Sequence, residues 1–223
     1  MLNLNLYRIE KDNIRENLNK YTRKTFKLLP KCKNPLILDV GCGTGVPTIE
    51  LARISDGHVI GIDIDDTSLN LLQRKIKETG LNNRVSISRN SILVMDFPEE
   101  NFDIIWAEGS VFVIGFENSI KQWRRFLKPD GFLVIHDENI DKNKKLGLIK
   151  KYGYTLIAQF DLSDNLWWHE YYTPLEQLIK EFRNKYPNDS GLINELNKDQ
   201  IDIDKCKSNS IVTSSFFVIM QKI

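Results

Sequence analysis

A glycine-rich stretch constrains the fold of this chain more than any other feature. Residues 36–45 read Leu-Ile-Leu-Asp-Val-Gly-Cys-Gly-Thr-Gly, an apolar run with one acid followed by glycines at alternate positions. The run predicts a short buried strand entering a tight loop, because glycine adopts positive φ and lets a ligand approach the main chain. A helix candidate follows over 46–53, and Pro47 suits its first turn, where no N–H is required. We therefore expect a nucleotide-type cradle at the carboxyl end of a strand.

The glycine spacing excludes two common nucleotide motifs. The dinucleotide fingerprint needs a glycine where Val46 stands, and the P-loop needs Gly-Lys-Ser/Thr, which does not follow Gly45. The remaining pattern, Asp-x-Gly-x-Gly-x-Gly, resembles the first motif of class I S-adenosylmethionine (SAM)-dependent methyltransferases. SAM has no phosphate and carries an ammonium and a sulfonium, so an acid at the loop entry suits it. The resemblance implies SAM contacts from Asp39, Gly41, Cys42, Gly43 and Gly45; a structural turn with incidental glycines is the alternative.

A second acid stands at the end of the next predicted strand, over 58–63. Asp63 follows Gly45 by 18 residues, which matches an acid that accepts both ribose hydroxyls of an adenosine. A plain strand-end acid is the alternative, and Ile64 is the adjacent candidate contact. Asp65 and Asp66 begin a helix, where caps and dipole complements are expected.

The segment over 89–98 resembles the third motif of the same family. Asn90 stands where the family commonly has Asp, and it keeps a carbonyl acceptor for the exocyclic amine of adenine. The backbone N–H of Ser91 or Ile92 is the candidate donor to a ring nitrogen.

A fourth predicted strand, over 102–106, leads into a run that resembles a narrower branch, the ubiquinone/menaquinone-biosynthesis type of small-molecule methyltransferase. This run spans 106–117, and in the family it faces the transferable methyl. Glu108 is the candidate for holding or deprotonating an acceptor, with a cofactor-ordering acid as an equal alternative. Trp106 and Phe112 are candidate substrate contacts.

Aromatic residues concentrate after the sixth predicted strand. Aromatic side chains with polar tips suit the wall of an acceptor pocket, and a core plug is the alternative reading. His169 could exchange a proton near neutral pH and is a candidate catalytic residue. The candidate substrate contacts here are Trp167, Trp168, Tyr171 and Tyr172.

Strands and helices alternate along the 223 residues, which predicts an α/β fold. With the resemblance, we expect a Rossmann-like, seven-stranded, mostly parallel sheet with helices on both faces. The last strand, over 211–220, is then antiparallel and lies between the fifth and the sixth. We expect an N-terminal helical cap over 1–34, containing one helix over 9–29. The methyltransferase domain follows over 35–223, with a substrate-side insertion over 161–210.

The composition limits which binding partners and which cellular compartment we expect. The formal net charge of +1 favours neither nucleic acid nor an anionic membrane. Cys32, Cys42 and Cys206 form no zinc pattern and indicate reduced thiols in a cytoplasm. We propose no metal site at 136–138, because adjacent strand residues point in opposite directions. The amino terminus is too polar for a signal peptide, and no apolar run reaches the ~20 residues of a membrane helix.

These observations favour an enzyme that transfers a methyl group from SAM to a small-molecule acceptor. A SAM- or adenosine-binding regulator without turnover is the first alternative. A nicotinamide-dependent oxidoreductase is disfavoured by Val46 and by the absence of a Tyr-x-x-x-Lys pair in the body of the domain. A nucleic-acid methyltransferase is disfavoured because Ala-Glu-Gly-Ser replaces the Asn/Asp-Pro-Pro-Tyr/Phe signature after the fourth strand. Monomer and homodimer both remain open.

Overall fold

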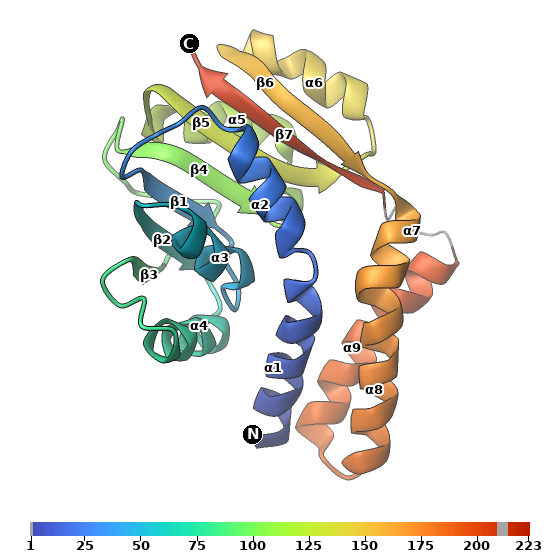
Figure 1. The fold of residues 1–223 in the computed structure, drawn as a ribbon. Helices are drawn as coiled ribbons and strands as arrows, with labels where there is room; N and C mark the ends of the chain where they lie inside the picture. Colours follow the sequence, from blue (N-terminus) through green and yellow to red (C-terminus); the bar gives the residue numbers. More distant parts are fainter. Residues whose placement is uncertain (1, 209–213) are drawn as a thin grey trace. The chain divides into compact units, whose positions relative to one another are not determined.

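The computed structural model describes residues 2–208 and 214–223, which form two compact units (Figure 1). The sheet unit comprises residues 20–161 and 216–223, and the helical unit comprises residues 1–19 and 162–215. This division differs from the predicted cap over 1–34, because residues 1–19 group with the segment before the last strand. Residues 20–34 group with the sheet.

The sheet unit contains the predicted seven-stranded sheet, in the order β3-β2-β1-β4-β5-β7-β6. Strands β1 to β5 pair in parallel, and β7 runs against β5 (Figure 1). β7 lies between β5 and β6, as the resemblance implied. The strands are β1 Leu36–Val40, β2 His58–Asp63, β3 Val85–Arg89, β4 Phe102–Glu108, β5 Leu127–Glu138, β6 Tyr154–Leu162 and β7 Ser215–Lys222. The first part of the predicted seventh strand, 211–213, lies outside the described residues.

Helices cover both faces of the sheet, as predicted. Because side chains alternate along a strand, Ile105 of β4 points into a core shared with Ile120 and Ile149, whereas Trp106 points to the opposite face, where its ring lies 6.5 Å from that of Phe26. The helices of the sheet unit are α2 Asn19–Leu28, α3 Val46–Ile54, α4 Asp66–Glu78, α5 Phe116–Trp123 and α6 Lys142–Lys151, with 3-10 turns η1 Val111–Val113 and η2 Arg124–Phe126.

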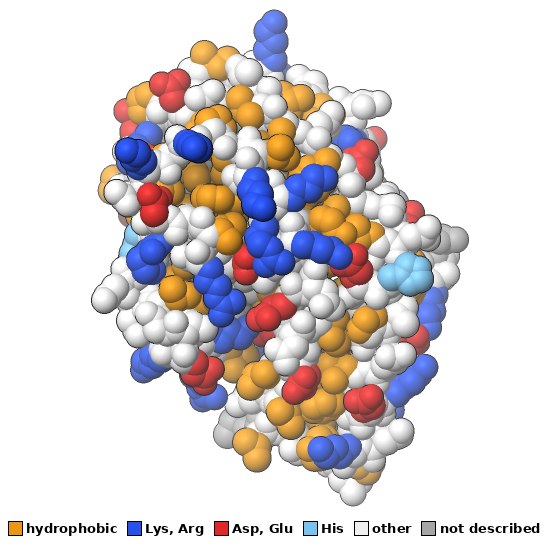
Figure 2. Space-filling view, in the orientation of Figure 1, with side chains coloured by type: hydrophobic (Ala, Val, Ile, Leu, Met, Phe, Trp, Pro, Cys, Tyr) orange, Lys and Arg blue, Asp and Glu red, His pale blue; other side chains and the backbone are white. Residues whose placement is uncertain are grey.

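Helix α2 presents a cationic face at helical spacing. Figure 2 shows Lys and Arg side chains gathered in the centre of the view, where Figure 1 draws α2. Arg23 pairs with Glu50 at 2.8 Å, and the Lys24 ammonium lies 3.8 Å from the Phe160 ring centroid. Part of this face therefore anchors α2 to the sheet unit. The exposed basic residues of α2 are Lys20, Arg23, Lys24 and Lys27.

The single helix predicted over 9–29 is wrong, because the structure has two helices there. α1 spans Leu2–Glu16 and α2 begins at Asn19. The Asn17 and Leu18 N–H groups donate to carbonyls three residues back, which tightens and ends the first helix. Asn17 and Asn19 flank the break, and asparagine favours caps and turns over helix interiors.

Residues 127–131 form a bulge inside β5. Phe102 pairs with Leu127, whereas Ile104 pairs with Phe132. The four residues 128–131 of β5 therefore lie opposite the single residue Asp103 of β4. Asp130 has φ of 61°, a left-handed conformation that Asp tolerates in turns. β5 therefore begins before this turn and continues after it.

The helical unit contains α1, α7 Asp164–Trp167, the π-helix η3 Trp168–Tyr172, α8 Thr173–Lys185 and α9 Ser190–Lys207. The π-helical segment η3 leads directly into α8, so Pro174 lies near the start of α8 within a continuous helical run. Pro174 has no N–H to bond the carbonyl of Glu170, which instead accepts from Asn17 Nδ2 at 3.4 Å. The widened π turn and this side-chain donor replace the missing helical bond.

Polar pairs join α1 to α9 within the helical unit. The Tyr7 hydroxyl donates to Asp199 at 2.6 Å, and Lys11 pairs with the same carboxylate at 2.5 Å. Arg8 pairs with Glu195 at 3.1 Å. Burial and the Asp199 charge raise the pKa of Tyr7 above its ordinary range, so its hydroxyl stays protonated as a donor.

Within residues 2–208 and 214–223, we find no helix with both the length and the apolar character needed to cross a bilayer.

Candidate cofactor site

The glycine loop forms as predicted between β1 and α3. Gly41, Gly43 and Gly45 have φ of 72°, 53° and 83°, the region in which glycine is favoured. A Cβ on Gly41 would lie 2.5 Å from Ser110 Cβ, whereas a Cβ on Gly43 would meet nothing within 4 Å. Gly41 is therefore required for close packing, while Gly43 leaves its side of the main chain open to a ligand.

Asp63 lies at the end of β2, beside this loop. Its Oδ2 accepts from the Gly43 N–H at 2.8 Å, and its Oδ1 accepts from the Asp65 N–H at 2.9 Å. Two backbone donors thus fix the carboxylate, and each oxygen keeps a second lone pair for a further hydroxyl. Asp65 caps α4 by accepting from the Thr67 and Ser68 N–H groups, as its predicted structural role requires.

A cavity of about 290 Å³ opens at this edge of the sheet, and we call it the cofactor cavity. It includes six of the predicted cofactor contacts and the predicted substrate contact Phe112, which is exposed. Its lining is mostly apolar around one carboxylate and one carboxamide, a combination that suits a purine nucleoside. The lining residues are Gly41, Ile62, Asp63, Ile64, Asn90, Ser91, Ile92, Leu93, Gly109, Ser110, Phe112 and Val113.

Asn90 is oriented by two hydrogen bonds on the rim of this cavity. Its backbone N–H donates to the carbonyl of Asp63 at 3.1 Å, and its Nδ2 donates to Ser88 Oγ at 2.9 Å. Because the amide nitrogen is used in this way, the carboxamide oxygen is the group left to accept from a ligand amine.

Ser110 is a lining residue that the sequence analysis did not single out. Its hydroxyl donates to the Val40 carbonyl at 2.6 Å, so it ties the end of β4 to the end of β1. The need for glycine at position 41 follows from this contact. The sequence analysis also missed Ile62, Leu93, Gly109 and Val113. Ile62 lies inside a predicted strand, and only the positions of the other three after predicted strands could have indicated them.

The other predicted cofactor residues lie around the glycine loop without lining the cavity. Asp39 is buried and accepts from the Thr48 hydroxyl at 2.6 Å. Cys42 is buried as well, and burial, with Asp39 and Asp63 nearby, raises the pKa of its thiol. The thiol therefore stays neutral at pH 7, which suits packing rather than nucleophilic attack. Gly43 and Gly45 shape the loop.

Glu108 is held by donors from two elements of the sheet unit. Its Oε1 accepts from Trp106 Nε1 at 2.7 Å and from the Thr22 hydroxyl of α2 at 2.9 Å. Trp106 is fully buried and does not line the cofactor cavity. The structure therefore gives Trp106 an orienting contact with Glu108.

The remaining predicted substrate contacts lie in the helical unit, on α7 and η3. Trp167 donates its indole N–H to Ser215 Oγ at 3.0 Å, and its ring contacts Tyr171 and Tyr172. Trp168, Tyr171 and Tyr172 pack against the core of this unit, while His169 is exposed. Their role toward an acceptor stays a prediction.

Comparisons with known proteins agree with this geometry. Residues 37–131 match the model of the methyltransferase domain family. The chain is 30% identical over 154 residues to phosphoethanolamine N-methyltransferase of Plasmodium falciparum, a match that covers 65% of this chain and 56% of that protein. The chain thus spans only about half the length of this relative.

Solved structures share the fold. The cyclase SpnF has a TM-score of 0.73 at 18% identity, covering 91% of this chain and 80% of its own. A SAM-dependent methyltransferase from Geobacter sulfurreducens, in complex with S-adenosylhomocysteine (SAH), has a TM-score of 0.69 at 14% identity, covering 93% and 91%. Residues 37–131, which form most of the sheet unit, are therefore similar to a methyltransferase domain.

Proposed function

We propose that this protein transfers a methyl group from SAM to a small-molecule acceptor, with SAM held in the cofactor cavity. The observation that carries the proposal is the Asp63 carboxylate, fixed by the Gly43 and Asp65 N–H groups beside an open glycine loop. The similarity of residues 37–131 to a methyltransferase domain and the SAH-bound neighbour support the same cofactor.

The adenosine part of the cofactor has candidate partners in this cavity. Asp63 accepts from the ribose hydroxyls, and the Asn90 carboxamide oxygen accepts from the exocyclic amine of adenine. The apolar side chains of Ile64 and Ile92 cover the purine faces, and the Ser91 or Ile92 N–H donates to the ring. When bound, SAM supplies an electrophilic methyl group on its sulfonium.

The chain's contribution to the transfer is chiefly positioning. An acceptor must lie in line with the methyl carbon and the sulfur, and such orientation accounts for much of the rate in reactions of this kind. We assign Glu108 to holding the acceptor rather than to carrying its proton. Both the Trp106 and the Thr22 donors fix Oε1 in one direction, which suits an orienting carboxylate.

The aromatic segment of the helical unit supplies our candidates for acceptor specificity. It lies outside residues 37–131, so the matched domain says nothing about it. We keep Trp167, Trp168, Tyr171 and Tyr172 as acceptor contacts and His169 as a candidate base. Two finer points belong to this proposal as well. The placement in the ubiquinone/menaquinone-type branch rests on residues 106–117, and a cytoplasmic location rests on three cysteines that form no disulfide.

A product assay tests the proposal. The protein is incubated with SAM and a panel of amine, phenol, quinol and isoprenoid acceptors, and SAH is quantified. We expect SAH formation with at least one acceptor and its loss in Glu108→Gln. SAM binding without product from any class favours a regulator, and binding of NADH but not SAM would overturn the assignment. The likeness to a cyclase makes this assay necessary, because the fold alone does not fix the reaction.

A further inference from the structure

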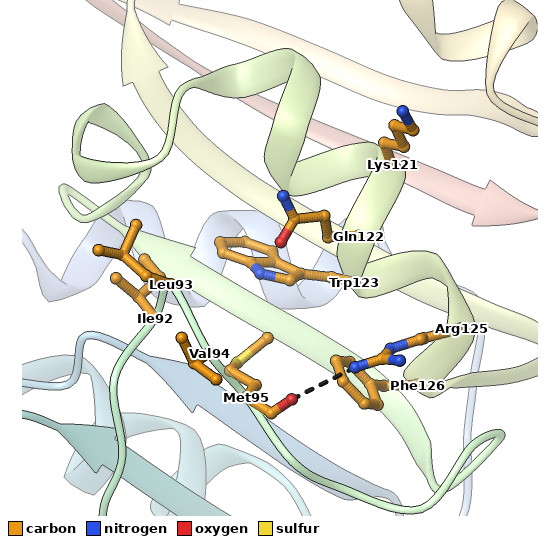
Figure 3. Close-up of a pocket in the computed structure, with 9 residues that line it drawn as sticks. All are labelled: Ile92, Leu93, Val94, Met95, Lys121, Gln122, Trp123, Arg125 and Phe126. Atoms are coloured by element: carbon orange, nitrogen blue, oxygen red, sulfur yellow. Dashed lines mark hydrogen bonds between the residues drawn. The ribbon is translucent and has the colours of Figure 1, made fainter.

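A second and larger cavity, of about 400 Å³, lies in the sheet unit (Figure 3). We call it the Trp123 cavity. It is formed by the loop after β3 together with α5 and η2, and its volume falls within the range of small-molecule sites. Its lining residues are Ile92, Leu93, Val94, Met95, Lys121, Gln122, Trp123, Arg125 and Phe126.

The Trp123 side chain leaves a buried donor in this cavity. The residue is 0% exposed, yet among the described residues none accepts a hydrogen bond from its Nε1. In Figure 3 the nitrogen edge of the indole faces the loop segment 92–95 across the cavity. Indole nitrogen is a donor only, and buried donors in native proteins almost always have an acceptor. An acceptor from outside the chain is therefore expected here.

The charges around the cavity indicate an anionic acceptor. Its lining, all within the described part of the chain, includes two cations and no carboxylate. Arg125 donates one N–H to the Met95 carbonyl at 3.4 Å, which fixes the guanidinium at the cavity wall while its other donors remain for use (Figure 3). The Lys121 ammonium points away from the indole in this view, so it adds positive potential at the rim.

The opposite wall is apolar and continues to the surface. Met95 is buried, whereas Leu93 and Val94 are 56% and 76% exposed. The side chains of 92–95 thus form an apolar strip from the buried indole outward, facing Phe126 on the other side. Such a strip suits an extended apolar tail.

We propose that the Trp123 cavity binds a small carboxylate with an apolar tail. The carboxylate accepts from Trp123 Nε1 and is attracted by Arg125, and the tail lies along Leu93, Val94 and Met95. Ile92 and Leu93 line both this cavity and the cofactor cavity, so the two sites share a wall. The proposal does not depend on SAM or on methyl transfer.

Octanoate titration followed by NMR tests this site. The chain has four tryptophans and therefore four indole ¹H–¹⁵N signals. We expect one signal, missing in Trp123→Phe, to shift and saturate with octanoate at submillimolar concentration, on the order of 0.1–1 mM. Octylammonium, of equal length and opposite charge, should bind at least tenfold more weakly. The experiment is repeated with saturating SAH, so that binding in the cofactor cavity is separated from binding at Trp123.

Variants separate charge from packing. Arg125→Gln should weaken octanoate about five- to tenfold, as expected for loss of one charge-assisted contact, and leave octanol binding unchanged. The matched control Lys77→Gln, at an exposed position of α4, should leave the binding of octanoate and of octanol unchanged. If Trp123→Phe does not fold, the Met95 methyl signal, identified in Met95→Leu, reports the tail instead. No shift of the Trp123 signal up to about 10 mM, or equal binding of octylammonium, would overturn the proposal and leave a water-filled cavity.

Discussion

The two units of this protein are stabilised by different chemistry. In the sheet unit, Leu38 and Val40 of β1 are 0% exposed and belong to the apolar core. In the helical unit the buried Tyr7 ends in a hydroxyl bonded to Asp199, and ion pairs flank it. At β1 the sheet unit is therefore held by apolar area, whereas at α1 and α9 the helical unit also depends on specific polar pairs.

The two units also differ in how far apart in the sequence their interacting residues lie, and this distance determines which contacts a sequence pattern can predict. The glycine loop and Asp63 are separated by 18 residues, and their strand pattern is local. Tyr7 and Asp199 are 192 residues apart, and Arg8 and Glu195 are 187 apart. A local sequence pattern can therefore predict the glycine loop and Asp63. The pairs between α1 and α9 cannot be predicted in this way, because only the fold brings their partners together.

The largest expected effect is loss of apolar packing in the sheet unit. Ile105→Ala removes a 0% exposed side chain from the core and should cost about 2–5 kcal/mol of unfolding free energy. Urea unfolding measures it, with Leu156→Ala at a 41% exposed position as the control. Equal costs for the two variants would show that burial of Ile105 does not determine the stability of the sheet unit.

A smaller effect is expected from removing a polar partner in the helical unit. Asp199→Ala leaves the Tyr7 hydroxyl without its acceptor and Lys11 without its partner, at a cost of about 1–3 kcal/mol. Hydrogen exchange of the α9 amides measures the loss. Asp202→Ala, which removes an exposed pair with Lys205, should cost roughly 0–1 kcal/mol. If both variants behave alike, the polar pairs do not specify this unit.

A third variant tests a polar contact in the sheet unit, the hydrogen bond from Thr22 to Glu108. Thr22→Val removes the hydroxyl donor to Glu108 at constant shape, and we expect methyl transfer to fall about tenfold, equivalent to one hydrogen bond of ~1.4 kcal/mol. SAH affinity should be unchanged. The control is Thr25→Val, whose hydroxyl bonds only the Tyr21 carbonyl in the hydrogen bonds seen here. Activity equal to that of the control would remove Glu108 from its proposed role.

The smallest effect is a pH-dependent loosening at the start of α9. The Leu192 N–H and the Asn3 amide donate to Asp189 and lower its pKa. Because the pKa of Asp189 is lower in the folded than in the unfolded protein, its ionised carboxylate stabilises the fold at pH values above the unfolded pKa, about 3.9. This stabilisation is lost as the pH falls through the folded pKa.

Hydrogen exchange of the Leu192 amide should therefore accelerate below about pH 4. In Asp189→Asn, which retains a capping oxygen, this acceleration should disappear. If the Leu192 amide in Asp189→Asn still exchanged faster below about pH 4, a titrating group other than Asp189 would be responsible.

Much of the fold and half of the candidate site followed from the sequence. The glycine loop and Asp63 were predicted from their positions at the ends of predicted strands, and Asn90 was predicted from the resemblance of 89–98 to a family motif. Ser110 could not be found, because its value lies in a hydrogen bond to Val40, 70 residues earlier. The helix break at Asn17 was also missed, and Asn17 donates to the Glu170 carbonyl, a partner 153 residues away in the sequence.

The most direct test of the account is calorimetric titration of SAH into the wild-type protein and into Asp63→Asn. The variant loses the charge and one of the oxygens that accept from sugar hydroxyls. We predict wild-type binding with Kd in the micromolar range, on the order of 1–100 μM, and at least tenfold weaker binding by the variant. Asp66→Asn, on the exposed face of α4, should match the wild type. Absence of binding by the wild type, or equal affinity in Asp63→Asn, would contradict the assignment of this cavity to SAM.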